Sequence, residues 1–243
     1  MKKVILGAAL CGAAVALAGT ANADGANDFL SGSTNALILG VTGIPTPDAA
    51  YISDAENLYL DPNGYDGTTA STLALTTPET YDFDPSVTQG ESDIVNAVVA
   101  DYDAGDMDCT AAGLCSDPLT IFAYSQSAAD ASLVEQQLDA DKIPSDALRF
   151  VMVGANPTGV TDNLYPTDVY DINGDFWAEP ASVGTTLQDL VIGMLVHDTY
   201  LGLTPAEIDS ATTIVDGMTT IFSIPALTTT ELIEALIGTA SAG

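Results

Sequence analysis

The sequence has very few basic residues. Lysine and arginine together number four against 34 acidic residues, so the formal net charge is −30 at neutral pH. Two of the four are Lys2 and Lys3, and only Lys142 and Arg149 lie further along the chain. Nucleic acids are bound through clusters of basic side chains that meet the phosphates, so the composition excludes nucleic acid as an expected partner. An anionic membrane surface would repel the chain for the same reason.

The chain also lacks an apolar run that could span a membrane stably. The run at residues 4–17 is too short for a span. It follows Lys2 and Lys3 and precedes Ala21-Asn22-Ala23, a small-residue cleavage pattern. This arrangement is typical of a secretory signal peptide. We therefore expect residues 1–23 to be removed after Ala23 and the mature chain to be secreted or to lie in the cell envelope.

Cysteine and histidine are scarce as well. There are three cysteines, and Cys11 lies within the expected signal peptide. A zinc site needs several cysteine or histidine ligands close together, so we expect no metal site of this kind. In an exported chain, Cys109 and Cys115 are expected to form one disulfide that closes a small loop.

The remaining chain alternates between short apolar strands and amphipathic helices. This order predicts a parallel sheet with helices on both faces, and so an α/β fold in one domain over residues 24–243. Strands are expected at 35–40, 72–76, 119–123 and 148–153, and helices at 48–60, 86–104 and 127–138.

The C-terminal third follows a less regular pattern. Residues 165–180 are predicted to be a loop or a ragged strand, and 187–196 a helix. Helical pieces are expected at 205–218 and 229–237. Because this tail is apolar, we expect residues 204–243 to form a helical wall or lid over an apolar pocket.

Ser125 stands where the strand at 119–123 gives way to the helix at 127–138. A serine on such a turn is held clear of the sheet, at a helix N-terminus where negative charge is favoured. The small residues Ala123 and Ser127, two positions before and two after, allow the turn to close. The pattern is a relaxed form of the G-x-S-x-G nucleophile elbow and predicts Ser125 as a nucleophile.

A serine nucleophile needs a base, and the base needs an orienting acid. The only histidine, His197, must be that base, and it follows Ser125 in the chain order found in α/β-hydrolases. Asp175 is the expected acid because Gly174 before it permits a tight turn and the aromatic residues after it could shield an ion pair. Asp171 is the alternative acid.

The oxyanion hole of such an enzyme consists of backbone N–H groups. One donor is expected from Gln126, directly after the nucleophile, and the other from Thr42 or Gly43, in the loop after the first strand. These donors would stabilise a tetrahedral intermediate, so the expected chemistry is acyl transfer to water, and no cofactor is required.

The segment Asp171–Asp175 has a competing interpretation as the start of a calcium loop of the form D-x-N-x-D. The sixth position, where glycine is required, is Phe176, and Ser182 stands where a bidentate glutamate should be. We therefore expect no calcium site here.

Several segments together carry a family resemblance, and they occur in the same order along the chain as the family's motifs. They are Gly40–Pro47 (compare GGTGxPTP), Ala123–Ala128 (GYSQSA), Tyr170–Phe176 (YDxxxDFP), Val196–Tyr200 (VHxxY) and Thr219–Pro225 (TxYYxIP). These motifs resemble those of the PE-PPE domain of mycobacteria and related actinobacteria.

The resemblance implies a serine α/β-hydrolase related to cutinases, a three-layer sandwich that hydrolyses short- to medium-chain carboxylic esters, including lipid esters. It assigns Ser125 as nucleophile, Asp175 as acid and His197 as base. Ala123 stands where the elbow motif has glycine, which adds a methyl group at a tightly packed turn. The alternative function is therefore a weakly active or inactive binding module on the same fold.

Overall fold

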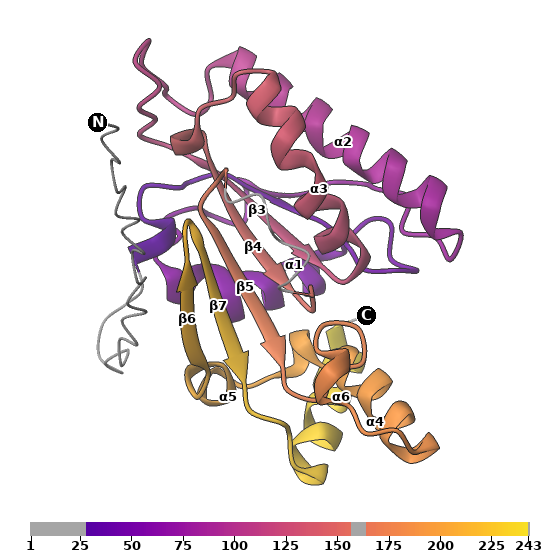
Figure 1. Ribbon diagram of the computed structural model, residues 1–243. Helices are drawn as coiled ribbons and strands as arrows, with labels where there is room; N and C mark the ends of the chain where they lie inside the picture. Colours follow the sequence, from indigo (N-terminus) through magenta and orange to yellow (C-terminus); the bar gives the residue numbers. More distant parts are fainter. Residues whose placement is uncertain (1–27, 157–163, 243) are drawn as a thin grey trace, which may run out of the picture.

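The computed structural model describes residues 28–156 and 164–242, so the expected signal peptide, with Cys11 and the cleavage site after Ala23, lies outside the described residues. Its centre is a seven-stranded sheet in the order β2-β1-β3-β4-β5-β7-β6 (Figure 1). Neighbouring strands are parallel except β6 and β7, which are antiparallel. The strands are β1 (Ala36–Ile38), β2 (Thr72–Ala74), β3 (Leu119–Tyr124), β4 (Leu148–Val153), β5 (Thr167–Ile172), β6 (Thr212–Asp216) and β7 (Thr219–Ile224).

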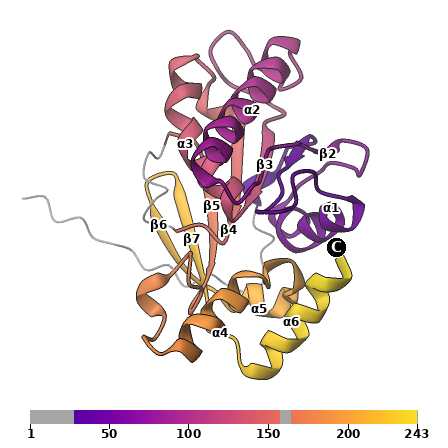
Figure 2. The ribbon, with the colours of Figure 1, turned by 90° about the vertical axis from the view of Figure 1, so that its right-hand side faces the viewer.

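Helices cover both faces of this sheet. Two of them, α2 and α3, pack together on one face, while α1 and α6 lie on the other (Figures 1 and 2). Helix α4 lies beyond the carboxyl ends of the strands (Figure 1). The helices are α1 (Ala49–Ala55, continued by one π-helical turn to Leu60), α2 (Phe83–Ala104), α3 (Gln126–Ala140), α4 (Leu187–His197), α5 (Pro205–Asp209) and α6 (Thr229–Ala242). None of the helices described is both long and apolar enough to cross a membrane.

The alternation of side chains along β3 explains the two cores. Ile121 and Ala123 point into the cluster beneath α2 and α3, whereas Phe122 and Tyr124 point into the cluster on the α1 side. Successive residues of a strand face opposite sides of the sheet, so a central strand covered on both faces must be apolar throughout. All six residues of β3 are buried. The predicted α/β-hydrolase-like fold, with a mainly parallel sheet and helices on both faces, is confirmed.

The strand order reverses between β1 and β3. From β1 the chain passes to β2 on one side, and all later strands lie on the other side. In open α/β sheets, ligands bind in the crevice at the carboxyl ends of the strands at such a switch point. The loop that holds Thr42 follows β1, and the turn that holds Ser125 follows β3. The topology therefore brings these two segments together.

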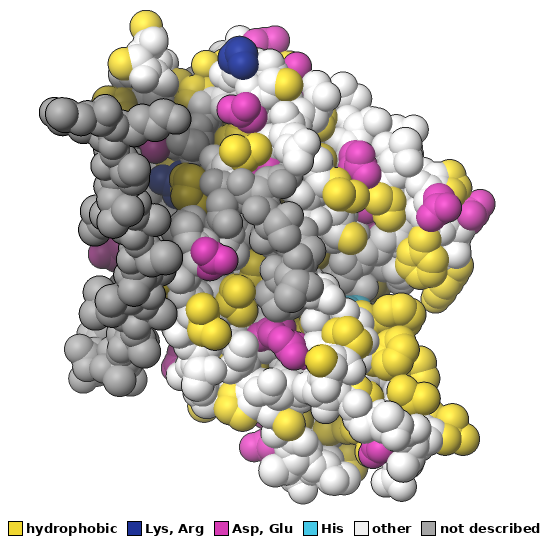
Figure 3. All heavy atoms as spheres, in the orientation of Figure 1, with side chains coloured by type: hydrophobic (Ala, Val, Ile, Leu, Met, Phe, Trp, Pro, Cys, Tyr) yellow, Lys and Arg dark blue, Asp and Glu magenta, His cyan; other side chains and the backbone are white. Residues whose placement is uncertain are grey.

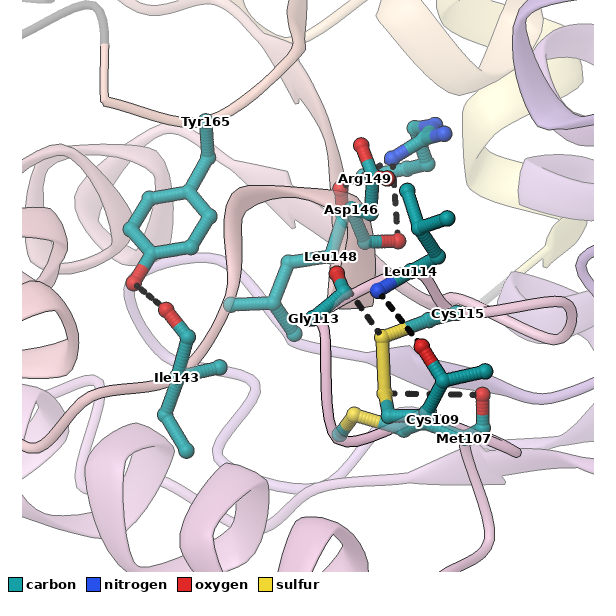
Figure 4. The surroundings of a disulfide bond; sticks show 11 residues. Met107, Cys109, Gly113, Leu114, Cys115, Ile143, Asp146, Leu148, Arg149 and Tyr165 are labelled. Carbon is teal, nitrogen blue, oxygen red and sulfur yellow. Dashed lines mark hydrogen bonds between the residues drawn. A yellow bond between two sulfur atoms is a disulfide. The ribbon is translucent and has the colours of Figure 1, made fainter.

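The predicted disulfide between Cys109 and Cys115 is confirmed. In Figure 4 the loop that it closes lies beside the segment that leads into β4. A Cβ added at Gly113 would lie 3.4 Å from Cβ of Pro144, an ordinary van der Waals contact, so the two segments are neighbours. The disulfide closes the loop before β3, and this loop packs beside the segment that leads into the neighbouring strand β4.

One prediction for the C-terminal third was wrong, and another had left open two alternatives between which the structure decides. Residues 205–218 do not form one helix, because α5 ends at Asp209 and the chain then forms the hairpin of β6 and β7. Its strands are rich in threonine, isoleucine and valine, which favour sheets, and Gly217 adopts a φ of 63° in the turn. The segment predicted to be a loop or ragged strand contains β5, an entirely buried strand whose polar residues, such as Asp168, hid its pattern.

Two buried carboxyl groups lie near the start of α2. Glu79 belongs to the segment that leads into this helix, and Asp130, on α3, faces Gly90 of α2. Burial raises the pKa of Glu79 to about 7 and that of Asp130 to about 8, where the nearby Glu79 carboxylate adds to the shift. Both oxygens of Asp130 and Oε2 of Glu79 have no hydrogen-bond partner among the described residues. The folded protein therefore holds protons on these groups at pH values where the unfolded chain would have released them.

This protonation predicts a loss of stability as the pH rises. A folded pKa above the ordinary value of 3.8 for Asp130 means that its full contribution is present below about pH 4 and is lost as the pH passes through about 8. We expect Asp130→Asn to flatten this part of the profile and to raise the free energy of unfolding at pH 8 by roughly 1–3 kcal/mol. Urea unfolding at pH 5, 6, 7 and 8 measures the effect.

The control for Asp130→Asn is Asp103→Asn, which removes an exposed carboxylate. The control variant should keep the wild-type slope, since it also replaces one aspartate by asparagine but leaves the buried carboxyl group of Asp130 in place. Equal slopes for all three proteins would contradict the prediction.

Candidate active site

Ser125 occupies a sharp turn between β3 and α3. Its φ of 60° and ψ of −115° place a non-glycine residue in a rarely populated backbone region that costs roughly 1–3 kcal/mol. The hydroxyl of Ser127 accepts a hydrogen bond from the N–H of Tyr124 at 2.9 Å, and the Ser125 N–H donates to the carbonyl of Val153. These bonds hold the turn closed with the Ser125 side chain on its outer side.

His197 reaches Ser125 from the last residue of α4. Its Nε2 lies 2.7 Å from Oγ of Ser125. The start of α4 is stabilised by a capping box between Thr186 and Asp189, and at its end the hydroxyl of Tyr124 donates to the carbonyl of His197. The imidazole is therefore positioned by a capped helix and by the side chain next to the serine.

The other imidazole nitrogen faces Asp175, in the turn after β5. Nδ1 of His197 lies 2.8 Å from Oδ2 and 3.0 Å from Oδ1 of this fully buried carboxylate. With Nδ1–H donating to the carboxylate, Nε2 of the neutral ring is free to accept the proton of the Ser125 hydroxyl.

Three further donors hold the Asp175 carboxylate. The backbone N–H groups of Trp177 and Ala178 donate to Oδ1 at 2.7 and 3.1 Å, and the hydroxyl of Tyr200 donates to Oδ2 at 2.8 Å. Tyr200 in turn accepts a hydrogen bond from the N–H of Ile172. A buried carboxylate with this many donors is held in one orientation, with its charge compensated.

Asp171, the alternative acid, lies elsewhere. It is the second-last residue of β5 and is buried there. It makes no hydrogen bond to His197. Burial, followed by the neighbouring Glu179 carboxyl, raises the pKa of Asp171 to about 7. Asp171 is therefore not the residue that contacts the histidine.

Of the predicted oxyanion-hole residues, Gln126 and Thr42 line the cavity next to Ser125. Gln126 is the first residue of α3, where N–H groups have no acceptor within the helix. The Thr42 hydroxyl donates to Oε1 of Gln126 at 2.9 Å and so links the two loops. Gly43 differs from the prediction, because its N–H donates to the carbonyl of Glu79 at 2.6 Å and is already occupied.

The Ser125 side chain opens into a cavity of about 520 Å³. Its walls come from the loop after β1, the segment that leads into α2, the first turns of α3, the residues after β4, Trp177 and the end of α4. Apolar side chains such as Val41, Phe83, Val87 and Ala129 form most of the surface.

The predicted tail wall is absent from this cavity, since no described residue after Asp198 lines it. The β6–β7 hairpin carries the chain to the edge of the sheet. Helix α6 then packs on the turn at Tyr200–Gly202 and on α1 instead.

The sequence analysis did not identify Gly154, the residue directly after β4. Its φ is 62°, and a Cβ placed there would lie 3.0 Å from Cε1 of His197 and 3.1 Å from the ring of Tyr200. Only glycine allows the backbone to approach the imidazole this closely. A glycine at the carboxyl end of a predicted central strand was the available signal.

Among the described residues, no group of three or more histidine, cysteine, aspartate or glutamate side chains gathers in a way that could hold a metal ion. In the segment considered as a calcium loop, Asp175 faces His197 and Asp171 is buried in β5.

We expect Gly154→Ala to displace the imidazole and to slow the reaction of Ser125 with an organophosphonate by about 10- to 100-fold. Gly105→Ala is the matched control, since Gly105 also has a positive φ, of 85°, but a Cβ there meets nothing within 4 Å. Both variants carry the backbone penalty, and only the first carries the collision. Equal labelling rates in the two variants would contradict the prediction.

Comparison with known proteins agrees with this architecture. Residues 61–167 match the model of the PE-PPE domain. The chain is 32% identical to the uncharacterized PPE family protein PPE28 of Mycobacterium tuberculosis (strain H37Rv) over 216 residues, which cover 73% of this chain and 31% of that protein. It is 28% identical over 225 residues to the protein named esterase PE16 of the same organism, covering 77% of this chain and 40% of that protein.

The chain thus spans less than half the length of each of these relatives. The family match includes β2, α2, β3, α3, β4 and the start of β5, and so it contains the turn of Ser125. The resemblance expected from the motifs is confirmed, and the chain carries a PE-PPE domain.

Proposed function

We propose that this protein is a serine carboxylesterase that hydrolyses short- to medium-chain carboxylic esters, including lipid esters. The observation that carries the proposal is the hydrogen-bonded row of Ser125, His197 and Asp175 at the floor of an open apolar cavity. An esterase- or lipase-like function is also supported by the PE-PPE domain and by the relative named an esterase.

In the first half of the proposed reaction, Oγ of Ser125 attacks the ester carbonyl carbon while its proton passes to Nε2 of His197. Asp175 keeps the imidazole in the required tautomer and stabilises the imidazolium that forms. The tetrahedral intermediate then collapses to an acyl-enzyme. The alcohol leaves with the proton that His197 returns to it.

In the second half, His197 removes a proton from a water molecule, and the resulting hydroxide attacks the acyl carbonyl carbon. Collapse of the second tetrahedral intermediate breaks the bond to Oγ, Ser125 regains its proton from His197, and the carboxylic acid departs. In both halves, the backbone N–H groups of Gln126 and Thr42 are proposed to hold the oxyanion, and the N-terminus of α3 adds favourable potential. No cofactor takes part.

The cavity supports an acyl group as the part of the substrate that is bound. Val87 from α2 and Ala129 from α3 contribute to a predominantly apolar channel that begins at Ser125. Desolvation of alkyl groups gives roughly 0.8 kcal/mol for each buried CH₂ group, so such a channel favours esters with several carbons in the acyl chain. Sugars and peptides would leave their polar groups without partners there.

The alternative function, a binding module with weak or absent catalysis, was suggested by Ala123. In this fold Ala123 is fully buried beneath α2 and α3, and the turn at Ser125 still has the strained backbone typical of a nucleophile elbow. The methyl group of Ala123 therefore does not favour an inactive binding module over an active enzyme.

Export to the cell envelope or the medium is part of the proposal. It depends on the expected signal peptide at residues 1–23 and is consistent with the disulfide between Cys109 and Cys115. Nucleic acid remains excluded as a proposed partner by the net charge of −30.

The first test is hydrolysis of p-nitrophenyl esters of graded chain length by residues 24–243. We expect turnover with an optimum at short to medium acyl chains, and a loss of about 10³-fold or more in Ser125→Ala, because no other group can form the acyl-enzyme. Absence of turnover in a folded wild-type chain would support the binding module instead.

The second test separates the two aspartates. Asp175→Asn should lower kcat by about 10³- to 10⁴-fold, since an amide cannot stabilise the imidazolium or select the tautomer. Asp171→Asn, an equally buried and isosteric change, should stay within about threefold of wild type. A large loss in Asp171→Asn with little loss in Asp175→Asn would overturn the assignment.

A further inference from the structure

The outer face of α4 is apolar where a surface helix is normally polar. Gly193 and Val196 point inward, and the opposite side presents Leu187, Val191 and Leu195, which are 79%, 43% and 39% exposed. The helix rises about 1.5 Å per residue, so this stripe leads away from His197 over roughly 15 Å. The apolar stripe therefore ends two residues before His197, on the side of α4 that faces away from Gly193 and Val196.

A second set of exposed hydrophobic side chains lies across the cavity mouth. Tyr81 and Phe83, at the start of α2, are 79% and 49% exposed, and Trp177 is 54% exposed. All three also line the cavity that holds Ser125. Figure 3 shows hydrophobic side chains gathered over the N-terminal end of α2 and over α4, with the histidine visible between them. We call this surface the apolar rim: Tyr81, Phe83, Trp177, Leu187, Val191 and Leu195.

The charge around the apolar rim limits what can cover it. Asp82 and Asp84 alternate with the two aromatic residues at the start of α2 and are exposed, as is Asp198 at the cavity mouth. The acid on α4, Asp189, is engaged with Thr186 in the capping box. An apolar surface flanked only by carboxylates is repelled by anionic surfaces and fits an apolar surface without negative charge.

We propose that the apolar rim docks the protein on the surface of an aggregated, uncharged lipid ester, and that this surface supplies the substrate. The inference rests on the proposed function. Docked in this way, the cavity mouth faces the lipid directly, so an ester passes from the aggregate to Ser125 without crossing water. Exposed apolar side chains gathered at one place mark this kind of interaction site.

A second copy of the chain is a less suitable occupant. Two molecules that each carry a net charge of −30 repel one another. A symmetric dimer through the apolar rim would also cover both cavity mouths, and substrate could then enter neither.

The experiment uses residues 24–243 with triacylglycerol droplets and, in parallel, a fully dissolved p-nitrophenyl ester. In wild type, the rate of triester hydrolysis should rise steeply once the ester exceeds its solubility limit. The double variant Leu187→Gln with Val191→Gln should lose about tenfold or more in droplet binding, measured by co-flotation, and in droplet hydrolysis. Its kcat/KM for the dissolved ester should stay within about twofold of wild type, because neither residue lines the cavity.

The matched control is Ile233→Gln with Ile237→Gln, two exposed isoleucines with the same spacing on α6, which lies away from the cavity. It should bind droplets like wild type. Ser125→Ala should float with the droplets without hydrolysing them, so docking can be tested even if the proposed esterase activity fails.

Equal flotation of wild type and the α4 double variant would overturn the docking proposal. A wild-type dimer in solution that the α4 double variant dissociates would also overturn it, in favour of a second copy. Stronger flotation with droplets that contain anionic lipid would contradict the argument from charge.

Discussion

The carboxylate of Asp175 is the group on which the arrangement of this site depends. It accepts hydrogen bonds from the backbone of Trp177 and Ala178, from the hydroxyl of Tyr200 and from His197. These donors come from the turn after β5, from the end of α4 and from the turn that follows it. One buried charge thus ties together the segments that hold the imidazole against Ser125, and removal of any one donor would leave the charge less compensated.

The other buried carboxyl groups show why the donors matter. Asp130 lies between α2 and α3 without a hydrogen-bond partner among the described residues, and its pKa is raised to about 8. Glu79 is raised to about 7, although it accepts a hydrogen bond from Thr77. A chain with 34 acidic residues thus places its carboxyl groups in two kinds of interior environment. Carboxyl groups with few or no donors have a raised pKa, and they weaken the fold as the pH rises through that pKa.

The surface has a similar division. Most of it is acidic, and that acidity excludes anionic partners, yet the apolar rim interrupts it around the cavity mouth. The strained backbone at Ser125, the absence of a side chain at Gly154 and the exposed leucines of α4 each cost stability or solubility. All three lie at the same end of the sheet. Costs of this kind are expected at a functional site, where the function requires them.

The alternation of apolar runs with helical patterns determined the α/β class, the elbow at Ser125 and the pairing of Cys109 with Cys115, because periodicity and spacing are local properties. The single histidine left no other choice of base. Local patterns could not decide between Asp171 and Asp175, the occupation of the Gly43 N–H, or the hairpin of β6 and β7. The first two depend on which groups meet across strands and loops distant in sequence. The hairpin depends on the free edge of the sheet beside β5, where strand pairing outweighed a helical pattern.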